Sequence, residues 1–193
     1  MNPFVVRPEE AEHIALPGGA GIRLLADAAD TGGAVGANLL KLAAGAEGAG
    51  PHHHTRSTEV FHVVAGTAWF RLFGPDGPDG PDGPDGGDGG DGAKGADGPG
   101  DADGPGGDRV ETVGAGGLVV VPPGTVHSFG AAPWQEAELL VLLTPGVDRF
   151  GYFRTLGRVR RGEEPFEILL PEQQRYDVHF AGAPRSVPPS RRR

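Results

Sequence analysis

Short runs of alternating apolar and polar residues, separated by Gly and Pro, make up most of this chain. Apolar side chains at every second position are typical of strands with one buried face. The pattern predicts ten short strands, and the turn signals between them favour a sandwich or a small barrel. The predicted strands cover residues 4–6, 21–26, 35–43, 51–54, 59–64, 68–73, 109–113, 118–121, 126–129 and 138–143.

A helical pattern follows the last predicted strand. In residues 148–161, Phe150, Phe153 and Leu156 recur at helical spacing, and basic residues fill the last turn. These features predict a helix that lies on the barrel with its apolar face inward. One further helical turn is expected at residues 171–176.

Residues 74–108 interrupt the strand pattern with a low-complexity insert of Gly, Pro and Asp. Gly at every third position from 74 to 98 is the spacing of collagen, but a rod of that length would extend about 80 Å. The few residues that follow could not return it to a neighbouring strand, so a rod is excluded if the insert joins two paired strands. The stretch 86–94 fits a calcium-binding β-roll repeat once, with Ala93 where a bulky apolar residue should anchor it. We expect a disordered acidic loop.

The net charge of −9 lies in this insert, which holds ten Asp and one Lys. The rest of the chain carries sixteen basic and sixteen acidic residues, so we expect no basic surface for nucleic acid. The absence of Cys excludes disulfides and thiolate chemistry. No targeting segment or membrane span is evident, so a cytoplasmic protein is expected.

The length of 193 residues suits one compact domain with added terminal segments. We expect N-terminal strands in residues 1–34 and a barrel in residues 35–145 that carries the insert. A helical segment in residues 146–180 and a disordered tail in residues 181–193 would complete the chain.

Four of the seven His residues and one Glu fall within the stretch GPHHHTRSTEVFHVVAG. On a strand, His52 and His54 share one face while His53 points to the other. The TRST turn then places Glu59 on the return strand with its carboxylate on the side of the two imidazoles. His127 follows a Pro-Pro-Gly turn at the start of another apolar strand. Three imidazoles and one carboxylate suit one divalent transition metal ion, which could be Fe, Mn, Ni, Co, Cu or Zn.

Other residues of these stretches have a structural interpretation as well. By alternation, His53 and His62 lie on the face opposite the predicted ligands, and we expect them to be structural or solvated. Phe61, Phe70 and Phe129 suit the core of a small barrel, and contact with a substrate is the alternative.

The same two stretches resemble the signature motifs of the cupin superfamily. The first motif reads G-x5-H-x-H-x3,4-E-x6-G, and its matches here are His52, His54, Glu59 and Gly66. The second motif reads G-x5-P-x-G-x2-H-x3-N, and its matches are Gly116, Pro122, Gly124 and His127.

Two positions depart from these motifs without removing a ligand. Ala46 replaces the opening Gly of the first motif, and Ala131 replaces the closing Asn of the second. The resemblance implies an all-β fold, a double-stranded β-helix of the cupin or jelly-roll type, with a short C-terminal helical segment. It also implies a metal ion inside the barrel, held by His52, His54, Glu59 and His127.

The runs PHHHTRSTEVFHVVAG, VVVPPGTVHSFG and TPGVDRFGYFRTLGRVRRGE resemble small single-domain cupins described as quercetinase-like. This resemblance implies a metal-dependent dioxygenase that takes dioxygen and an enolisable, flavonol-like aromatic substrate, with Glu59 as the catalytic base. The apolar pocket for that substrate would be formed by Phe61, Val63, Phe70 and Phe129.

Two alternatives stay open: a non-oxidative metal-dependent isomerase or cyclase, and a cupin that binds a small molecule without chemistry. A homodimer is expected, because exposed sheet edges can pair with a second copy.

Overall fold

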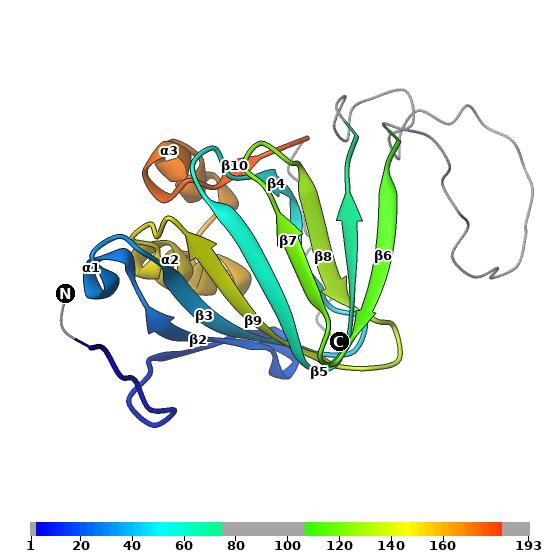
Figure 1. Cartoon of the computed structure of the whole chain (residues 1–193), viewed down its shortest axis with the longest axis horizontal. Coiled ribbons are helices and arrows are strands. Elements are labelled where there is room, and N and C mark those ends of the chain that lie inside the picture. The colour runs from blue at the N-terminus through cyan, green and yellow to red at the C-terminus, as the bar shows by residue number, and fades with distance from the viewer. Residues whose placement is uncertain (1–2, 75–106, 183–193) are drawn as a thin grey trace, which may run out of the picture.

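The computed structural model describes residues 3–74 and 107–182, and antiparallel strands dominate it (Figure 1). The strand order is β1-β2-β3-β9-β5-β8-β4-β10, with β6 and β7 also paired to β5. The expected all-β double-stranded β-helix with short C-terminal helices is confirmed. Its strands are β1 His13–Ala15, β2 Gly21–Ala26, β3 Gly36–Leu42, β4 Glu47–His53, β5 Thr58–Leu72, β6 Arg109–Gly114, β7 Leu118–Val121, β8 His127–Ala131, β9 Ala137–Thr144 and β10 His179–Phe180.

Strand β5 belongs to both layers of the barrel, and Figure 1 shows it turning from one into the other. Its first half pairs with β7 and β9, and its second half pairs with β6 and β8. The sequence predicts two strands here, 59–64 and 68–73, whereas the structure forms one bent strand. Gly66 explains the difference: it has a φ of 73° and still pairs with Ala137. A Cβ at Gly66 would lie 1.8 Å from the carbonyl oxygen of Glu136, so only Gly allows the bend with pairing retained.

The inner faces of the two layers enclose a single apolar core. Phe61 is central to it, with its ring centroid 5.1 Å from that of Phe70 and 4.9 Å from that of Phe129. These tilted contacts are the geometry that aromatic pairs prefer. The alternation predicted for β5 is confirmed, because Glu59, Phe61 and Val63 are buried while the residues between them are not.

The strand predicted at residues 4–6 is wrong, because these residues form no strand and their apolar side chains find no core. Phe4 is 46% exposed and Val5 is 70% exposed. The N-terminal strand is instead β1, which pairs with β2 and buries Ile14 in the core. A single buried side chain gives too weak an alternation for sequence analysis to detect.

Strand β4 begins earlier than the predicted 51–54 and ends at His53, so His54 follows the strand. Its first residues were missed because Gly is rare in strand interiors. Gly48 is needed there, since a Cβ at this position would lie 2.4 Å from the ring of Phe129. Register shifts on both sides of Ala49 show that β4 is irregular where it pairs with β8.

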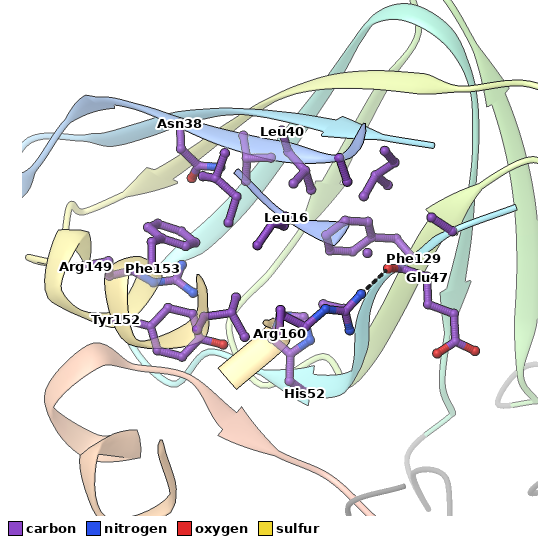
Figure 2. A pocket seen from close by; sticks show the side chains of 18 of the residues that line it. Leu16, Asn38, Leu40, Glu47, His52, Phe129, Arg149, Tyr152, Phe153 and Arg160 are labelled. Atoms are coloured by element: carbon purple, nitrogen blue, oxygen red, sulfur yellow. Dashed lines mark hydrogen bonds between the residues drawn. The ribbon is translucent and has the colours of Figure 1, made fainter. Parts of the chain in front are cut away.

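The predicted helix at residues 148–161 is confirmed as α2, Phe150–Arg160. Its side chains Phe150, Phe153 and Leu156 pack against the barrel core. Figure 2 shows Arg149, Tyr152 and Phe153 beside a cavity between this helix and the sheet. The turn expected at 171–176 falls in a 3₁₀ helix, Phe166–Glu172, and in α3, Gln173–Tyr176, while α1, Ala28–Thr31, was not predicted.

The acidic insert joins β5 and β6, two paired strands of one hairpin. Leu72 pairs with Arg109, and the backbone N–H of Gly74 donates to Asp108 Oδ1 at 3.2 Å. Residues 75–106, with the disordered loop and the β-roll repeat considered there, lie outside the described residues, as does the tail beyond 182. Within the described part of the chain, no helix is long and apolar enough to cross a membrane.

Candidate metal centre

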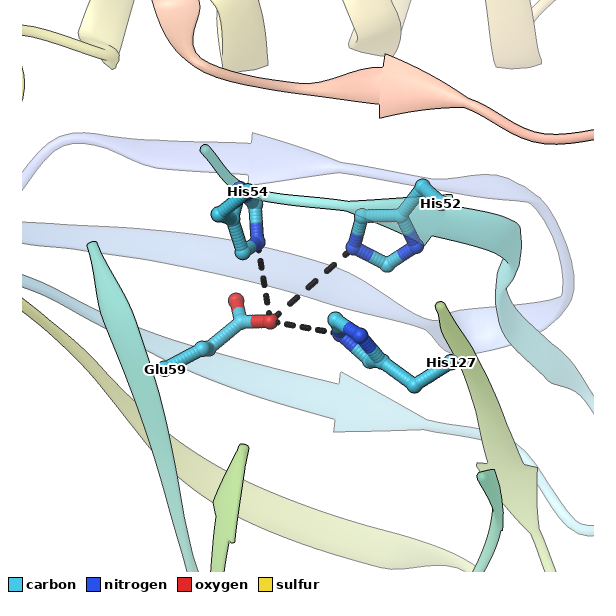
Figure 3. Close-up of side chains that lie close together, drawn as sticks. All are labelled: His52, His54, Glu59 and His127. Atoms are coloured by element: carbon cyan, nitrogen blue, oxygen red, sulfur yellow. Dashed lines mark hydrogen bonds and ion pairs between the residues drawn. The ribbon is translucent and has the colours of Figure 1, made fainter. Parts of the chain in front are cut away.

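Four buried side chains from different parts of the barrel converge at one point (Figure 3). His52 lies in β4, His54 directly after it, Glu59 near the start of β5 and His127 at the start of β8. One ligand atom from each residue lies within 4.8 Å of the others. The structure therefore brings together all the residues predicted as metal ligands, and the cluster can hold a metal ion.

The imidazoles meet one oxygen of the carboxylate. Nε2 of His127 lies 2.9 Å, Nε2 of His54 3.0 Å and Nε2 of His52 3.9 Å from Glu59 Oε2. Oε1 of Glu59 accepts no hydrogen bond from any described residue, and its neighbour is Nη1 of Arg149 at 4.0 Å. One carboxylate oxygen thus belongs to the cluster and the other is free.

Backbone carbonyls orient all three rings. Nδ1 of His52 lies 2.9 Å from the carbonyl of Gly50, and Nδ1 of His127 lies 3.0 Å from that of Thr125. Nδ1 of His54 faces the carbonyl of Asp177. A carbonyl only accepts, so each Nδ1 carries a proton and donates it. In the neutral ring, Nε2 then directs its lone pair at the cluster, which is the arrangement of histidines that bind metals.

This arrangement suits a cation at the centre. A neutral imidazole would direct the Nε2 lone pair at an ionised carboxylate, so the short contacts need either further protons or a metal ion. Burial lowers the pKa of His52 well below its ordinary value, and the charge of His127 lowers it further. Burial alone would raise the pKa of Glu59, but positive charge on His54 and hydrogen bonds from His127 and His54, when these rings are protonated, hold it well below its ordinary range. Three imidazole Nε2 atoms and one carboxylate oxygen directed at one point fit a divalent transition metal.

Asp177, which the sequence analysis missed, holds the loop that follows His54. Its buried carboxylate accepts hydrogen bonds from the backbone N–H groups of Thr55, Arg56 and Ser57 at 2.8–3.2 Å. The Thr55 hydroxyl donates to the same carboxylate at 2.7 Å. Nothing in the local sequence marks Asp177, because the loop that it binds is more than a hundred residues away.

The cluster opens into a cavity of about 100 Å³ between α2 and the sheet (Figure 2). His52 and Glu59 line this cavity, together with apolar side chains from β2, β3 and β9. Besides Glu47, four polar lining residues were not singled out by the sequence analysis: Asn38, Arg149, Tyr152 and Arg160. All four lie outside the two motifs. Asn38 comes from β3, whereas the packing of α2 on the barrel brings Arg149, Tyr152 and Arg160 to the site.

Of the residues predicted to contact a substrate, one lines the cavity and the others lie in the apolar core. Phe129 lines the cavity, whereas Phe61, Val63 and Phe70 lie in the core between the layers and are not among its lining residues. Their side chains face the same interior as Glu59 but pack against one another. Of the histidines outside the cluster, His53 stacks on His179, and Nδ1 of His62 lies 3.2 Å from the carbonyl of Gly117.

Comparisons with known proteins show the family to which the chain belongs. A family profile described as cupin matches residues 31–145, more than half of the chain. The chain belongs to the cupin family. No curated protein matches the sequence.

Several solved structures are similar to this one. An RmlC-like cupin from Shewanella frigidimarina has 18% identity and a TM-score of 0.48, over 78% of this chain and 96% of that chain. The polyketide cyclase RemF from Streptomyces resistomycificus has 18% identity and a TM-score of 0.48, over 75% and 80%. A Streptomyces PAC13 variant with uridine has 15% identity and a TM-score of 0.47, over 77% and 87%.

Proposed function

We propose that this cupin is a metal-dependent enzyme in which Glu59 removes a proton from an enolisable small molecule, with dioxygen as the second substrate. The observation that carries the proposal is that the two oxygens of the Glu59 carboxylate have different surroundings. Oε2 of Glu59 faces three imidazole Nε2 atoms, while Oε1 accepts no hydrogen bond from the described residues and Glu59 lines the cavity.

His52, His54, Glu59 and His127 would hold the ion. A divalent transition metal bound there would supply Lewis acidity and redox chemistry beside the cavity. The carbonyls of Gly50, Thr125 and Asp177 keep the three rings aimed at one point, so little reorganisation is needed when the ion binds.

Glu59 suits the role of general base because it is buried, lines the cavity and has one carboxylate oxygen that accepts no hydrogen bond from the described residues. A base must come within hydrogen-bond distance of the proton that it accepts, and Oε1 is the oxygen left free to do so. The apolar walls, which include Phe129, Leu40 and Val141, exclude water from the proton that is transferred.

The oxidative part of the proposal draws on the resemblance to quercetinase-like cupins. A dioxygenase incorporates both atoms of dioxygen into its substrate, so the substrate provides the electrons and no separate reductant is consumed. Pockets for drug-sized ligands usually measure roughly 300–1,000 Å³. A cavity of about 100 Å³ would admit a three-ring flavonol only if α2 moved or if most of the flavonol stayed outside.

Oxygen uptake tests this function directly. The purified protein is loaded in turn with Fe, Mn, Co, Ni, Cu or Zn and mixed with enolisable compounds of increasing size, from oxo acids to a flavonol. We expect substrate-dependent oxygen uptake that Glu59→Gln lowers by about 100-fold or more. The matched control is Glu47→Gln, since Glu47 lines the outer part of the cavity and is exposed. Absence of turnover with every metal would refute the enzyme proposal.

A non-oxidative isomerase or cyclase is the second candidate, because proton transfer by the free Oε1 of Glu59 needs no oxygen. Turnover that continues at the same rate under nitrogen would favour it over the dioxygenase. Binding of a small molecule that survives Glu59→Gln, without turnover in any condition, would favour a binding protein.

A further inference from the structure

The guanidinium of Arg149 is buried without a hydrogen-bond partner at the inner end of the cavity. Arg149 is only 6% exposed, and its Nε and Nη1 are fully buried without a partner. No described residue accepts a hydrogen bond from Nη2 either. Its nearest anionic group is Glu59, but the distance of 4.0 Å between Nη1 and Oε1 is too long for a hydrogen bond.

Neighbouring residues fix this guanidinium in place without satisfying it. Its carbon lies 5.5 Å from the ring centroid of Tyr152 and 5.4 Å from that of Phe153 (Figure 2). Aromatic faces attract a cation, but they provide no conventional acceptor for the N–H groups of the guanidinium. The backbone N–H groups of Arg149 and Phe150 donate to the carboxylate of Asp27 at 2.6 and 3.2 Å, which holds the start of α2.

A buried cation with unpaired N–H groups is unfavourable unless a ligand accepts their hydrogen bonds and balances the charge. Structures keep most buried polar groups hydrogen-bonded, and a buried charge is usually paired. Here the unpaired groups belong to a residue that lines the cavity shared with His52 and Glu59. Such an arrangement suits the recognition of an anion by the cavity.

The geometry points to a small carboxylate as the group that Arg149 binds, and we propose that the substrate is a small enolisable oxo acid. This inference rests on the proposed function and names its substrate class. The carboxylate would accept hydrogen bonds from the guanidinium while the rest of the acid extends toward Glu59.

The position of Arg149 limits the length of that acid. Because Nη1 lies 4.0 Å from the free oxygen of Glu59, an anion held by the guanidinium has its neighbouring carbons beside the base. A proton next to a carbonyl group one or two carbons from the carboxylate is then within reach of Oε1. The acids that meet this condition are short 2-oxo and 3-oxo acids.

The character of the cavity favours a carboxylate over a phosphate. Its lining is mainly apolar, and the volume of about 100 Å³ suits a molecule of a few carbons. A dianionic phosphate would also experience stronger repulsion from the ionised Glu59 at the same distance from Arg149. A planar carboxylate matches the guanidinium with a single negative charge.

Equilibrium binding under nitrogen tests this inference without any turnover. Isothermal titration calorimetry would compare pyruvate with pyruvamide, its neutral amide, and acetoacetate with acetoacetamide, in metal-free and metal-loaded protein. We expect each acid to bind at least about tenfold more tightly than its amide. Inorganic phosphate, added in a separate arm, is expected to bind more weakly than either acid.

Two variants of Arg149 and one control locate the anion. Arg149→Gln removes the charge and is expected to weaken acid binding by about tenfold or more, with the amides unaffected. Arg149→Lys keeps the positive charge but lacks the planar guanidinium, so we expect acid affinity between those of the wild type and Arg149→Gln. Arg160→Gln is the matched control, because Arg160 also lines the cavity but donates to the carbonyl of Glu47 at 3.4 Å.

Equal binding of acid and amide to the wild-type protein would overturn the inference, even if the variants failed to fold. Three other results would also overturn the inference. They are unchanged acid binding in folded Arg149→Gln, loss of acid binding in Arg160→Gln alone, and binding of phosphate that is tighter than that of either acid. Acid binding that depends on Arg149 but leads to no turnover with any metal would leave the anion site intact and refute the proposed function.

Discussion

The ring of His54 donates its Nδ1 proton to the backbone carbonyl of Asp177, which lies 123 residues further along the chain. The carboxylate of the same Asp177 accepts hydrogen bonds from the backbone of Thr55, Arg56 and Ser57. One residue of the C-terminal segment thus orients a predicted ligand through its main chain and holds the adjoining loop through its side chain. The helical segment after the barrel is part of the support of the candidate metal centre.

Removal of the Asp177 carboxylate should therefore weaken both the fold and the site. Asp177→Ala removes the acceptor of three backbone N–H groups, of which that of Ser57 is buried, and we expect the free energy of unfolding to fall by about 3 kcal/mol. Metal affinity should fall about 10- to 100-fold, because the loop after His54 is no longer held. Asp177→Asn is the matched control, since Asn tolerates the φ of 52° and keeps one acceptor oxygen. Urea unfolding and metal titration measure the two effects, and wild-type affinity in a folded Asp177→Ala would contradict this role.

The metal centre predicts a sharp contrast between neighbouring histidines. The protein should bind about one transition metal ion per chain, and His52→Ala with His54→Ala should abolish binding. His53→Ala should retain it, because His53 stacks on His179 away from the cluster. Elemental mass spectrometry after reconstitution gives the stoichiometry.

Metal binding should also stabilise the fold. At a free metal concentration about 1,000 times the dissociation constant, the gain is about 4 kcal/mol in the wild type and should vanish in the double variant. Equal metal content in the double variant and in His53→Ala would contradict the site.

Gly66 should be among the least replaceable residues of the barrel. In Gly66→Ala, the new Cβ meets the carbonyl oxygen of Glu136 and the φ stays positive, so we expect a loss of about 3 kcal/mol or more. Gly116→Ala is the control, because Gly116 also has a positive φ but a Cβ there would meet no heavy atom within 4 Å. The control should lose only about 1–2 kcal/mol. Equal losses in urea unfolding would show that the contact with Glu136 is unimportant.

The ion pair between Glu12 and Arg154 predicts a small pH dependence of stability. Hydrogen bonds from Arg154 hold the pKa of Glu12 below its ordinary value, at Nη2–Oε2 and Nε–Oε1 distances of 2.6 and 2.9 Å. Because the folded state binds this proton less readily than the unfolded state, the stabilisation is present above about pH 4.3 and is lost as the pH falls through the folded pKa. Both side chains are largely exposed, so the effect is at most about 1 kcal/mol.

Thermal unfolding of the wild type and of Glu12→Gln measures this dependence. The difference in Tm should be visible at pH 7, shrink near pH 3 and shrink also in 1 M salt. A difference that is constant between pH 3 and pH 7 would show that the ion pair does not cause it.

The hairpin that carries the acidic insert should fold without it. Leu72 pairs with Arg109 and Gly74 bonds Asp108, so residues 75–106 can be replaced by an Asn-Gly turn. Closure of the shorter loop loses less entropy, and we expect the free energy of unfolding to rise by roughly 1–2 kcal/mol. Metal content should stay unchanged, because the described cluster and cavity lie elsewhere. A loss of bound metal in a folded variant would contradict this.

The sequence by itself was sufficient for the features that depend on local pattern. The patterns of β2, β3 and β9 located these strands within a residue or two, since one face of each is buried throughout. The apolar run LVVV located β7. The spacing of His52, His54 and Glu59 placed three ligands on one side of a strand pair, because side chains alternate along a strand. His127 was found through the second motif, whose Pro-Pro-Gly turn is visible in the sequence.

Only the tertiary structure decided what distant segments contribute. Arg149 belongs to the site because the carboxylate of Asp27 holds the start of α2 against the barrel, and Asp177 belongs to it because its carbonyl meets His54. Residues more than a hundred positions apart make these contacts, and the periodicity of a single sequence cannot predict which distant residues will meet. Alternation likewise placed Phe61 and Val63 on the inner face, but it could not tell the core from the wall of the cavity. That difference depends on where α2 leaves space over the sheet, which side-chain packing determines.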